Sequence, residues 1–175
     1  MNIFLKSFLF LLSFSLFHFG YELTGWGFLK PFCGINESVF QHLKMSFWGY
    51  TLLAGAEFLI LKKKGHKIKN FFYSRMFSTI IIPWIMILTW YLLPAIYGRA
   101  GSLILDLTWA VLITYLCALF VIQIEKETEK IKFNIWTKVI ISILYIISVF
   151  LFILFTYKLP WIDLFINPEA LILYV

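Results

Sequence analysis

Residues 135–157 read IWTKVIISILYIISVFLFILFTY, and this stretch decides the fold class. Lys138 is its single charged residue. About 20 apolar residues in a helix are enough to cross the hydrocarbon core of a bilayer. Because lipid offers no hydrogen-bond partners, a spanning backbone must satisfy its polar groups within its own helix. The stretch therefore predicts a transmembrane helix.

Similar apolar runs recur along the chain. The predicted spans are residues 3–21, 39–61, 71–96, 102–124 and 135–157. The 175 residues are 62% hydrophobic, whereas a soluble domain is typically about 45–50% apolar. We therefore predict an all-α, polytopic membrane bundle of about five transmembrane helices, forming one domain over residues 1–175.

Two short segments give more detail, at the start of the second span and after the fifth. Ser38 with Gln41 three residues later fits a capping box for the second span, with Asn36 as a competing cap. Residues 158–175 contain Pro160, Asp163, Asn167, Pro168 and Glu169. These residues predict an irregular C-terminal segment rather than a sixth span.

The basic residues predict the orientation. Of the 15 Lys and Arg residues, 11 fall on the side shared by the N-terminus and the second-to-third and fourth-to-fifth loops. They are Lys6, Lys62, Lys63, Lys64, Lys67, Lys69, Arg75, Lys126, Lys130, Lys132 and Lys138. The other side holds Lys30, Lys44, Arg99 and Lys158. Since cytoplasmic loops are rich in Lys and Arg, we expect a cytoplasmic N-terminus, an outer C-terminal segment and a bacterial plasma membrane location.

The net charge of +6 does not indicate a nucleic-acid partner, because the basic residues gather at predicted helix ends. The run from Lys62 to Lys69 instead predicts contact with anionic lipid headgroups. Glu57 has two interpretations, a buried pair with Arg75 or a proton-relay carboxylate. The alternating Lys and Glu residues from Glu125 to Lys132 predict a solvated extension of the fourth span.

Polar residues near the outer ends of the spans form the candidate site, because ionisable groups at membrane depth are costly and often functional. The candidate ligand-binding residues are Glu22, Asn36, Glu37, His42, Lys44, Arg99 and Asp106. His18 lies one turn deeper than Glu22 and, four residues away, on the same helix face.

Three interpretations of these residues stay open. They are helix caps and ion pairs; a site that binds or moves a small polar solute or ion; or a metal site. The metal site would use His18, Glu22 and His42 with Glu37 or Asp106, since two imidazoles and two carboxylates suit Zn²⁺ and leave room for water. No spacing in the chain matches H-E-x-x-H.

Residues 36–44, NESVFQHLK, resemble the N-E-S-x-x-x-H-L-K motif of a family of small, uncharacterised multi-pass membrane proteins from Gram-positive bacteria. A weaker similarity covers Phe155-Thr156-Tyr157, Pro160 and residues 164–168. This chain has Gln41 where the family usually has Glu, and Asn167 where it has Asp. The resemblance implies a shared membrane fold and draws attention to Glu37, His42 and Lys44. It implies no substrate.

The sequence thus favours a protein that binds or transports a small polar solute or ion over an enzyme. One alternative is a metal-dependent hydrolase of a lipid or lipid-linked substrate, with Glu22 or Glu37 as the base acting on metal-bound water. Zinc is the cofactor that this alternative implies. Another alternative is a non-catalytic subunit, with an oligomer or a second membrane protein as its partner.

Overall fold

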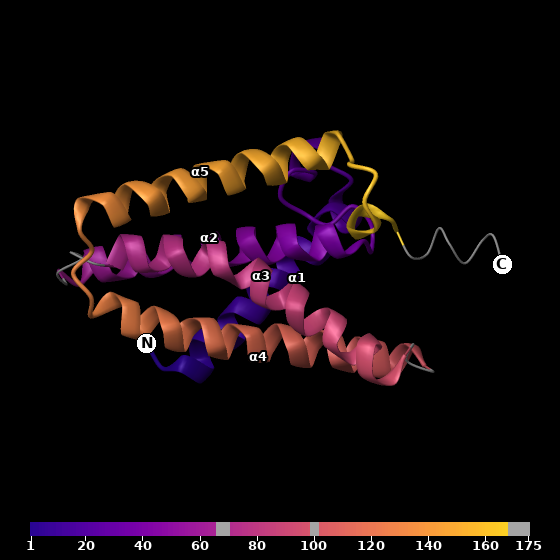
Figure 1. Ribbon diagram of the computed structural model, residues 1–175, viewed down its shortest axis with the longest axis horizontal. Coiled ribbons are helices and arrows are strands. Elements are labelled where there is room, and N and C mark those ends of the chain that lie inside the picture. Colours follow the sequence, from indigo (N-terminus) through magenta and orange to yellow (C-terminus); the bar gives the residue numbers. More distant parts are fainter. Residues whose placement is uncertain (66–70, 99–101, 168–175) are drawn as a thin grey trace.

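The computed structural model describes residues 1–65, 71–98 and 102–167. All regular elements in these ranges are helices (Figure 1). They are α1 (Ile3–Thr24), η1 (Gly27–Leu29), α2 (Val39–Lys63), α3 (Phe71–Tyr97), α4 (Leu103–Glu129), α5 (Ile135–Tyr157) and η2 (Asp163–Phe165). The all-α prediction is confirmed. Three predicted features fall at least partly outside the described residues. They are Arg99, residues 66–69 of the polybasic run, and residues 168–175 of the C-terminal segment.

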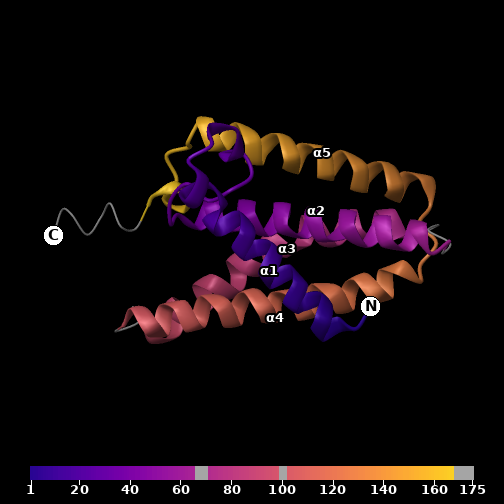
Figure 2. The same ribbon diagram turned by 180° about the vertical axis from the view of Figure 1, so that it is seen from behind.

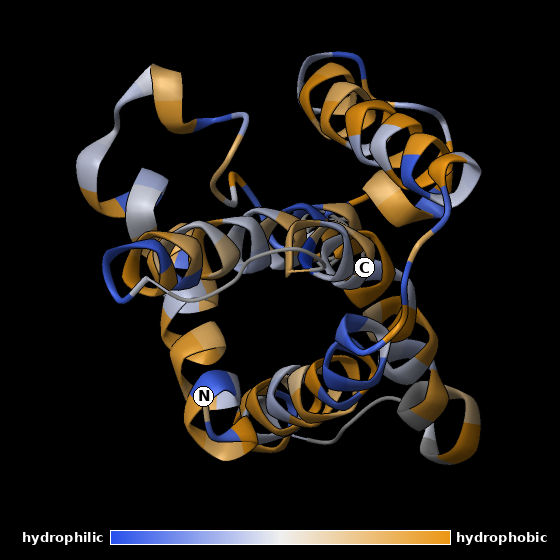
Figure 3. Ribbon diagram, turned by 90° about the vertical axis from the view of Figure 1, so that its left-hand side faces the viewer, coloured by the Kyte–Doolittle hydropathy of each residue, from blue (hydrophilic) through white to orange (hydrophobic). Residues whose placement is uncertain are grey.

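Four helices are long and apolar enough to cross a membrane: α1, α3 over Phe71–Leu92, α4 over Ile104–Glu129, and α5. In α5, large apolar side chains face outward, among them Ile140, Ile143, Ile146 and Phe150. Figure 3, which looks along the bundle, shows hydrophobic residues along the helices. The chain is therefore a multi-pass membrane protein. Its orientation and the identity of the membrane stay predictions.

The one long helix not in this group of four is α2. It is more polar than the others, and it occupies the middle of the bundle (Figures 1 and 2). Helices α1 and α3 pack against it. On the side of α5, the Phe47 ring lies 5.3 Å from Tyr145 and 5.0 Å from Phe152 between centroids. These neighbours shield Gln41, His42, Lys44 and Glu57 of α2 from lipid, since all four are buried.

Helix α2 begins at Val39, as predicted, with Ser38 as its N-cap residue. The predicted capping box is wrong, however. The Ser38 side chain makes no cap hydrogen bond, and the Gln41 amide is buried without a partner among the described residues. Asn36, the competing candidate, does not cap the helix either: its Oδ1 accepts a hydrogen bond from the Ser38 backbone N–H at 3.0 Å, in the turn that precedes α2.

Helices α1 and α2 approach each other closely at Gly49. The Ser13 hydroxyl donates a hydrogen bond to the Gly49 carbonyl at 2.9 Å. A β-carbon at Gly49 would lie 3.3 Å from the backbone nitrogen of Phe14. Small residues allow membrane helices to approach in this way. The contact sets the distance between the two helices that carry the histidines.

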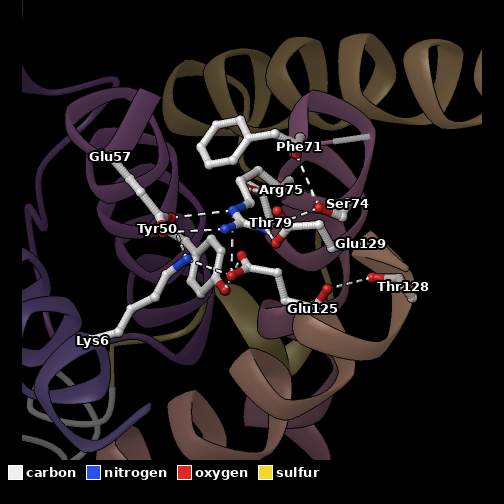
Figure 4. Close-up of polar contacts among 10 residues, drawn as sticks. All are labelled: Lys6, Tyr50, Glu57, Phe71, Ser74, Arg75, Thr79, Glu125, Thr128 and Glu129. Atoms are coloured by element: carbon white, nitrogen blue, oxygen red, sulfur yellow. Dashed lines mark hydrogen bonds and ion pairs between the residues drawn. The ribbon is translucent and has the colours of Figure 1, made fainter. Parts of the chain in front are cut away.

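One end of the bundle, here called the inner end, holds a buried group of charges from four helices (Figure 4). Lys6 of α1 contacts Glu57 of α2 at 2.5 Å and also contacts Glu125 of α4. Arg75 of α3 contacts Glu57 at 3.1 Å and Glu125 at 3.4 Å. The Tyr50 hydroxyl donates to Glu125 at 2.6 Å. Two positive and two negative charges thus neutralise one another.

The same group extends to the edge of the bundle, where Arg75 contacts the half-exposed Glu129 at 2.6 Å. We call Lys6, Tyr50, Glu57, Arg75, Glu125 and Glu129 the inner network. The pair of Glu57 and Arg75 anticipated from the sequence is present. The prediction of a solvated Glu125 is wrong, because its side chain is 1% exposed and α4 turns it toward Lys6 and Arg75.

Replacing Gly49 by valine is expected to lower the thermal unfolding midpoint, because the new side chain meets the α1 backbone. Overpacking of this kind costs about 1–3 kcal/mol. Gly55→Val is the matched control on the same helix, since a β-carbon there meets nothing within 4 Å. Equal midpoints for the two detergent-purified variants would contradict the close approach.

Glu125→Gln is expected to destabilise the protein strongly, because it leaves Lys6 and Arg75 sharing one buried carboxylate. Breaking a buried ion pair typically costs about 3–5 kcal/mol. Glu127→Gln on the same helix removes only an exposed pair with Lys130, which is worth about 0–1 kcal/mol.

Adding Lys6→Met to Glu125→Gln restores neutrality and should recover part of the loss. The measurement is the thermal unfolding midpoint of each variant in one detergent. An effect of Glu125→Gln no larger than that of Glu127→Gln would argue against the network.

Candidate functional site

At the opposite end of the bundle, the outer end, two histidines and one glutamate meet. His18 comes from α1, His42 from α2, and Glu37 from the segment before α2. His18 Nε2 lies 3.6 Å from Glu37 Oε1, and His42 Nε2 lies 3.4 Å from Glu37 Oε2. One ligand atom from each residue lies within 4.8 Å of the other two. We call these three residues the outer cluster.

The ring of His42 is held in place on several sides. Its Nδ1 is 3.0 Å from the Ser38 backbone carbonyl, one helical turn earlier. Because a carbonyl oxygen only accepts, Nδ1 is the donor. In the neutral ring, Nε2 is then an acceptor directed at Glu37. Phe14 stacks against the imidazole at 6.3 Å, and Trp90 of α3 lies 5.3 Å away, both between ring centroids.

The segment that carries Glu37 is fixed against α1 and α2. The Gly34 N–H donates to the Phe17 carbonyl at 3.0 Å. A β-carbon at Gly34 would lie 2.8 Å from Met45 Sδ, so a glycine keeps this contact close. The adjacent His18 imidazole, aided by His42, lowers the pKa of Glu37 below its usual range, against the effect of partial burial. Glu37 is therefore ionised at neutral pH.

A cavity of about 280 Å³ adjoins the outer cluster. It is lined by His18, Tyr21, Glu22, Gly34, Ile35, Asn36, Glu37 and Met45. Two carboxylates line it, and no Lys or Arg is among these lining residues. His18 Nδ1 is buried without a hydrogen-bond partner among the described residues. The cavity therefore offers several acceptors and little positive charge.

The predicted site residues separate into two groups. Glu22, Asn36 and Glu37 line the cavity with His18, and His42 joins them through Glu37.

Among the described residues, the candidates Lys44 and Asp106 do not line this cavity. Lys44 is buried and donates to the Lys30 carbonyl at 2.7 Å and to the Thr156 hydroxyl at 3.3 Å. It thereby ties the segment after α1 to the end of α5. Asp106 is exposed at the start of α4, and Arg99 lies outside the described residues.

Tyr21, Ile35 and Met45 also line the cavity but are not among the site residues predicted from the sequence. Met45 is three residues after His42, so helical periodicity would have placed it near the same face of α2. Tyr21 and Ile35 adjoin Glu22 and Asn36 in sequence. Only the folding of residues 25–37 against α1 makes them part of one cavity.

No curated protein and no solved structure matches this chain. A model of a family of unknown function, DUF6512, matches residues 3–170, which is nearly the whole chain. The family match agrees with the resemblance to an uncharacterised family. The chain therefore belongs to DUF6512, a family of unknown function.

Proposed function

We propose that this membrane protein binds a small cation in the cavity at its outer end. The observation that carries the proposal is the negative charge of the cavity lining. Glu22 and Glu37 line one cavity of about 280 Å³, and no lysine or arginine is among its lining residues. An ionised carboxylate that is partly removed from water is costly without a positive partner. A cation in the cavity would supply that partner.

The position of Lys44 supports this choice of charge. The sequence analysis groups Lys44 with the acidic residues as a candidate ligand-binding residue. Its ammonium group instead donates to the Lys30 carbonyl and the Thr156 hydroxyl. The contacts that Glu37 makes within the outer cluster are with two histidines. An anionic solute would meet two carboxylates with no lysine or arginine among the described lining residues, so a cation fits better.

The packing below the outer cluster supports exchange with the outer side. Phe14 stacks on His42, and the next ring toward the inner end, Phe10, contacts both Phe14 and Tyr50. Phe10, Phe14 and Tyr50 are buried in the core. The rings of Phe14 and Phe10 thus pack between the outer cluster and Tyr50 of the inner network. Binding from the outer side is therefore the activity that we propose.

A thermal-shift screen of the purified protein tests the proposal. The panel would contain inorganic cations, organic amines, neutral solutes and anions. A cation at about 100 times its dissociation constant should stabilise the protein by about 2.7 kcal/mol. The double variant Glu22→Gln/Glu37→Gln should lose this stabilisation, because both lining charges are gone.

Asp106→Asn is the matched control, since it removes an exposed carboxylate that does not line the cavity. It should keep the response to the cation. Stabilisation by anions alone, or an unchanged cation response in the double variant, would refute the proposed function.

A further inference from the structure

We infer that the cation is a divalent transition-metal ion of the Zn²⁺ class, held by His18, Glu37 and His42. This inference rests on the proposed function and specifies its ligand. The three residues come from α1, the segment before α2, and α2 itself. Their potential ligand atoms converge within 4.8 Å.

The distances in the outer cluster suit a tetrahedral ion. Zn²⁺ binds imidazole nitrogen and carboxylate oxygen at about 2.0–2.2 Å, so two such ligands in a tetrahedron lie about 3.4 Å apart. His18 Nε2 lies 3.6 Å from Glu37 Oε1, and His42 Nε2 lies 3.4 Å from Glu37 Oε2. Both distances are longer than the usual 2.7–3.2 Å of an N–H···O hydrogen bond. Each carboxylate oxygen thus faces one imidazole nitrogen at about the separation of neighbouring ligands around such an ion.

The tautomer of His42 adds an independent argument. Its Nδ1 donates to the Ser38 carbonyl, so in the neutral ring Nε2 presents a lone pair to the Glu37 carboxylate. Two acceptors then face each other at 3.4 Å. A metal ion between them would accept electron pairs from both and remove the repulsion. A backbone carbonyl that orients a histidine through its other nitrogen is also the usual outer-shell arrangement at metal sites.

The ligand types select the class of metal. Ca²⁺ and Mg²⁺ prefer all-oxygen sites with six or more ligands, whereas imidazole suits Zn²⁺ and its divalent transition-metal neighbours. Three protein ligands leave a fourth position open, as in catalytic rather than structural zinc sites. Here the cavity beside His18 and Glu37 would admit water to that position. In the metal-dependent hydrolase hypothesis, Glu22 in the lining of the same cavity would then be the base, since Glu37 serves as a ligand.

Metal titration of the purified protein tests the inference. After removal of metal with a chelator and dialysis, Zn²⁺ should bind with one ion per chain by calorimetry. His18→Ala, Glu37→Gln and His42→Ala should each weaken binding by at least about 10–100-fold, the range already seen when only an outer-shell partner is lost. Glu37 is half-exposed, so its variant should fold even if a histidine variant does not.

Controls and spectroscopy separate this site from surface binding. His66→Ala removes the third histidine of the chain, and Asp106→Asn removes an exposed carboxylate; both should keep wild-type affinity. Co²⁺ in the site should give the strong visible absorption of a four-coordinate ion. Loss of Zn²⁺ binding in His66→Ala equal to that in Glu37→Gln, or no Zn²⁺ binding at all, would overturn the inference.

The result distinguishes this inference from the proposed function. If Zn²⁺ fails to bind but an organic cation stabilises the protein through Glu22 and Glu37, the metal inference is wrong and the proposed function stands. If no cation of either kind stabilises the protein, both are wrong.

Discussion

The inner network is the interaction on which the rest of the structure depends. Lipid offers no partners to an ion, so charges buried in a membrane bundle must pair with one another. Lys6, Glu57, Arg75 and Glu125 come from α1, α2, α3 and α4 in turn, and each contacts two of the others. Rotation of any one of these helices would leave a buried charge unpaired. The network therefore fixes which faces of the four helices meet.

The packing of α1 on α2 determines how the two helices lie relative to each other between the inner network and the outer cluster. The close contact at Gly49 lies between the inner network and the histidines along both helices. Because α1 and α2 are held together both at the inner network and at Gly49, the rings of His18 and His42 lie 5.5 Å apart between centroids. Residues 36–44 of this chain contribute to the same arrangement: Asn36 and Ser38 orient the start of α2 and His42, while Lys44 anchors α5.

Much of the fold could be predicted from the sequence. Apolar runs located the helices, and the start of α2 was placed at the correct residue. The pairing of Glu57 with Arg75 was also foreseeable, because connected helices bring them to the same level. The burial of Glu125 was not foreseeable from its alternating charged surroundings. Its partners are far away in sequence: Lys6 on α1 is 119 residues away, Tyr50 on α2 is 75 residues away, and Arg75 lies on α3.

The sequence by itself determined the helices, because in lipid each backbone must complete its hydrogen bonds locally and only long apolar runs meet that demand. It also determined which polar residues lie at the outer level, since depth follows from position along a span. Only the tertiary structure decided which of them meet. Helix rotation and the course of residues 25–37 bring His18, Glu37 and His42 together and turn Lys44 toward α5. Those features depend on packing between distant segments, which local sequence does not encode.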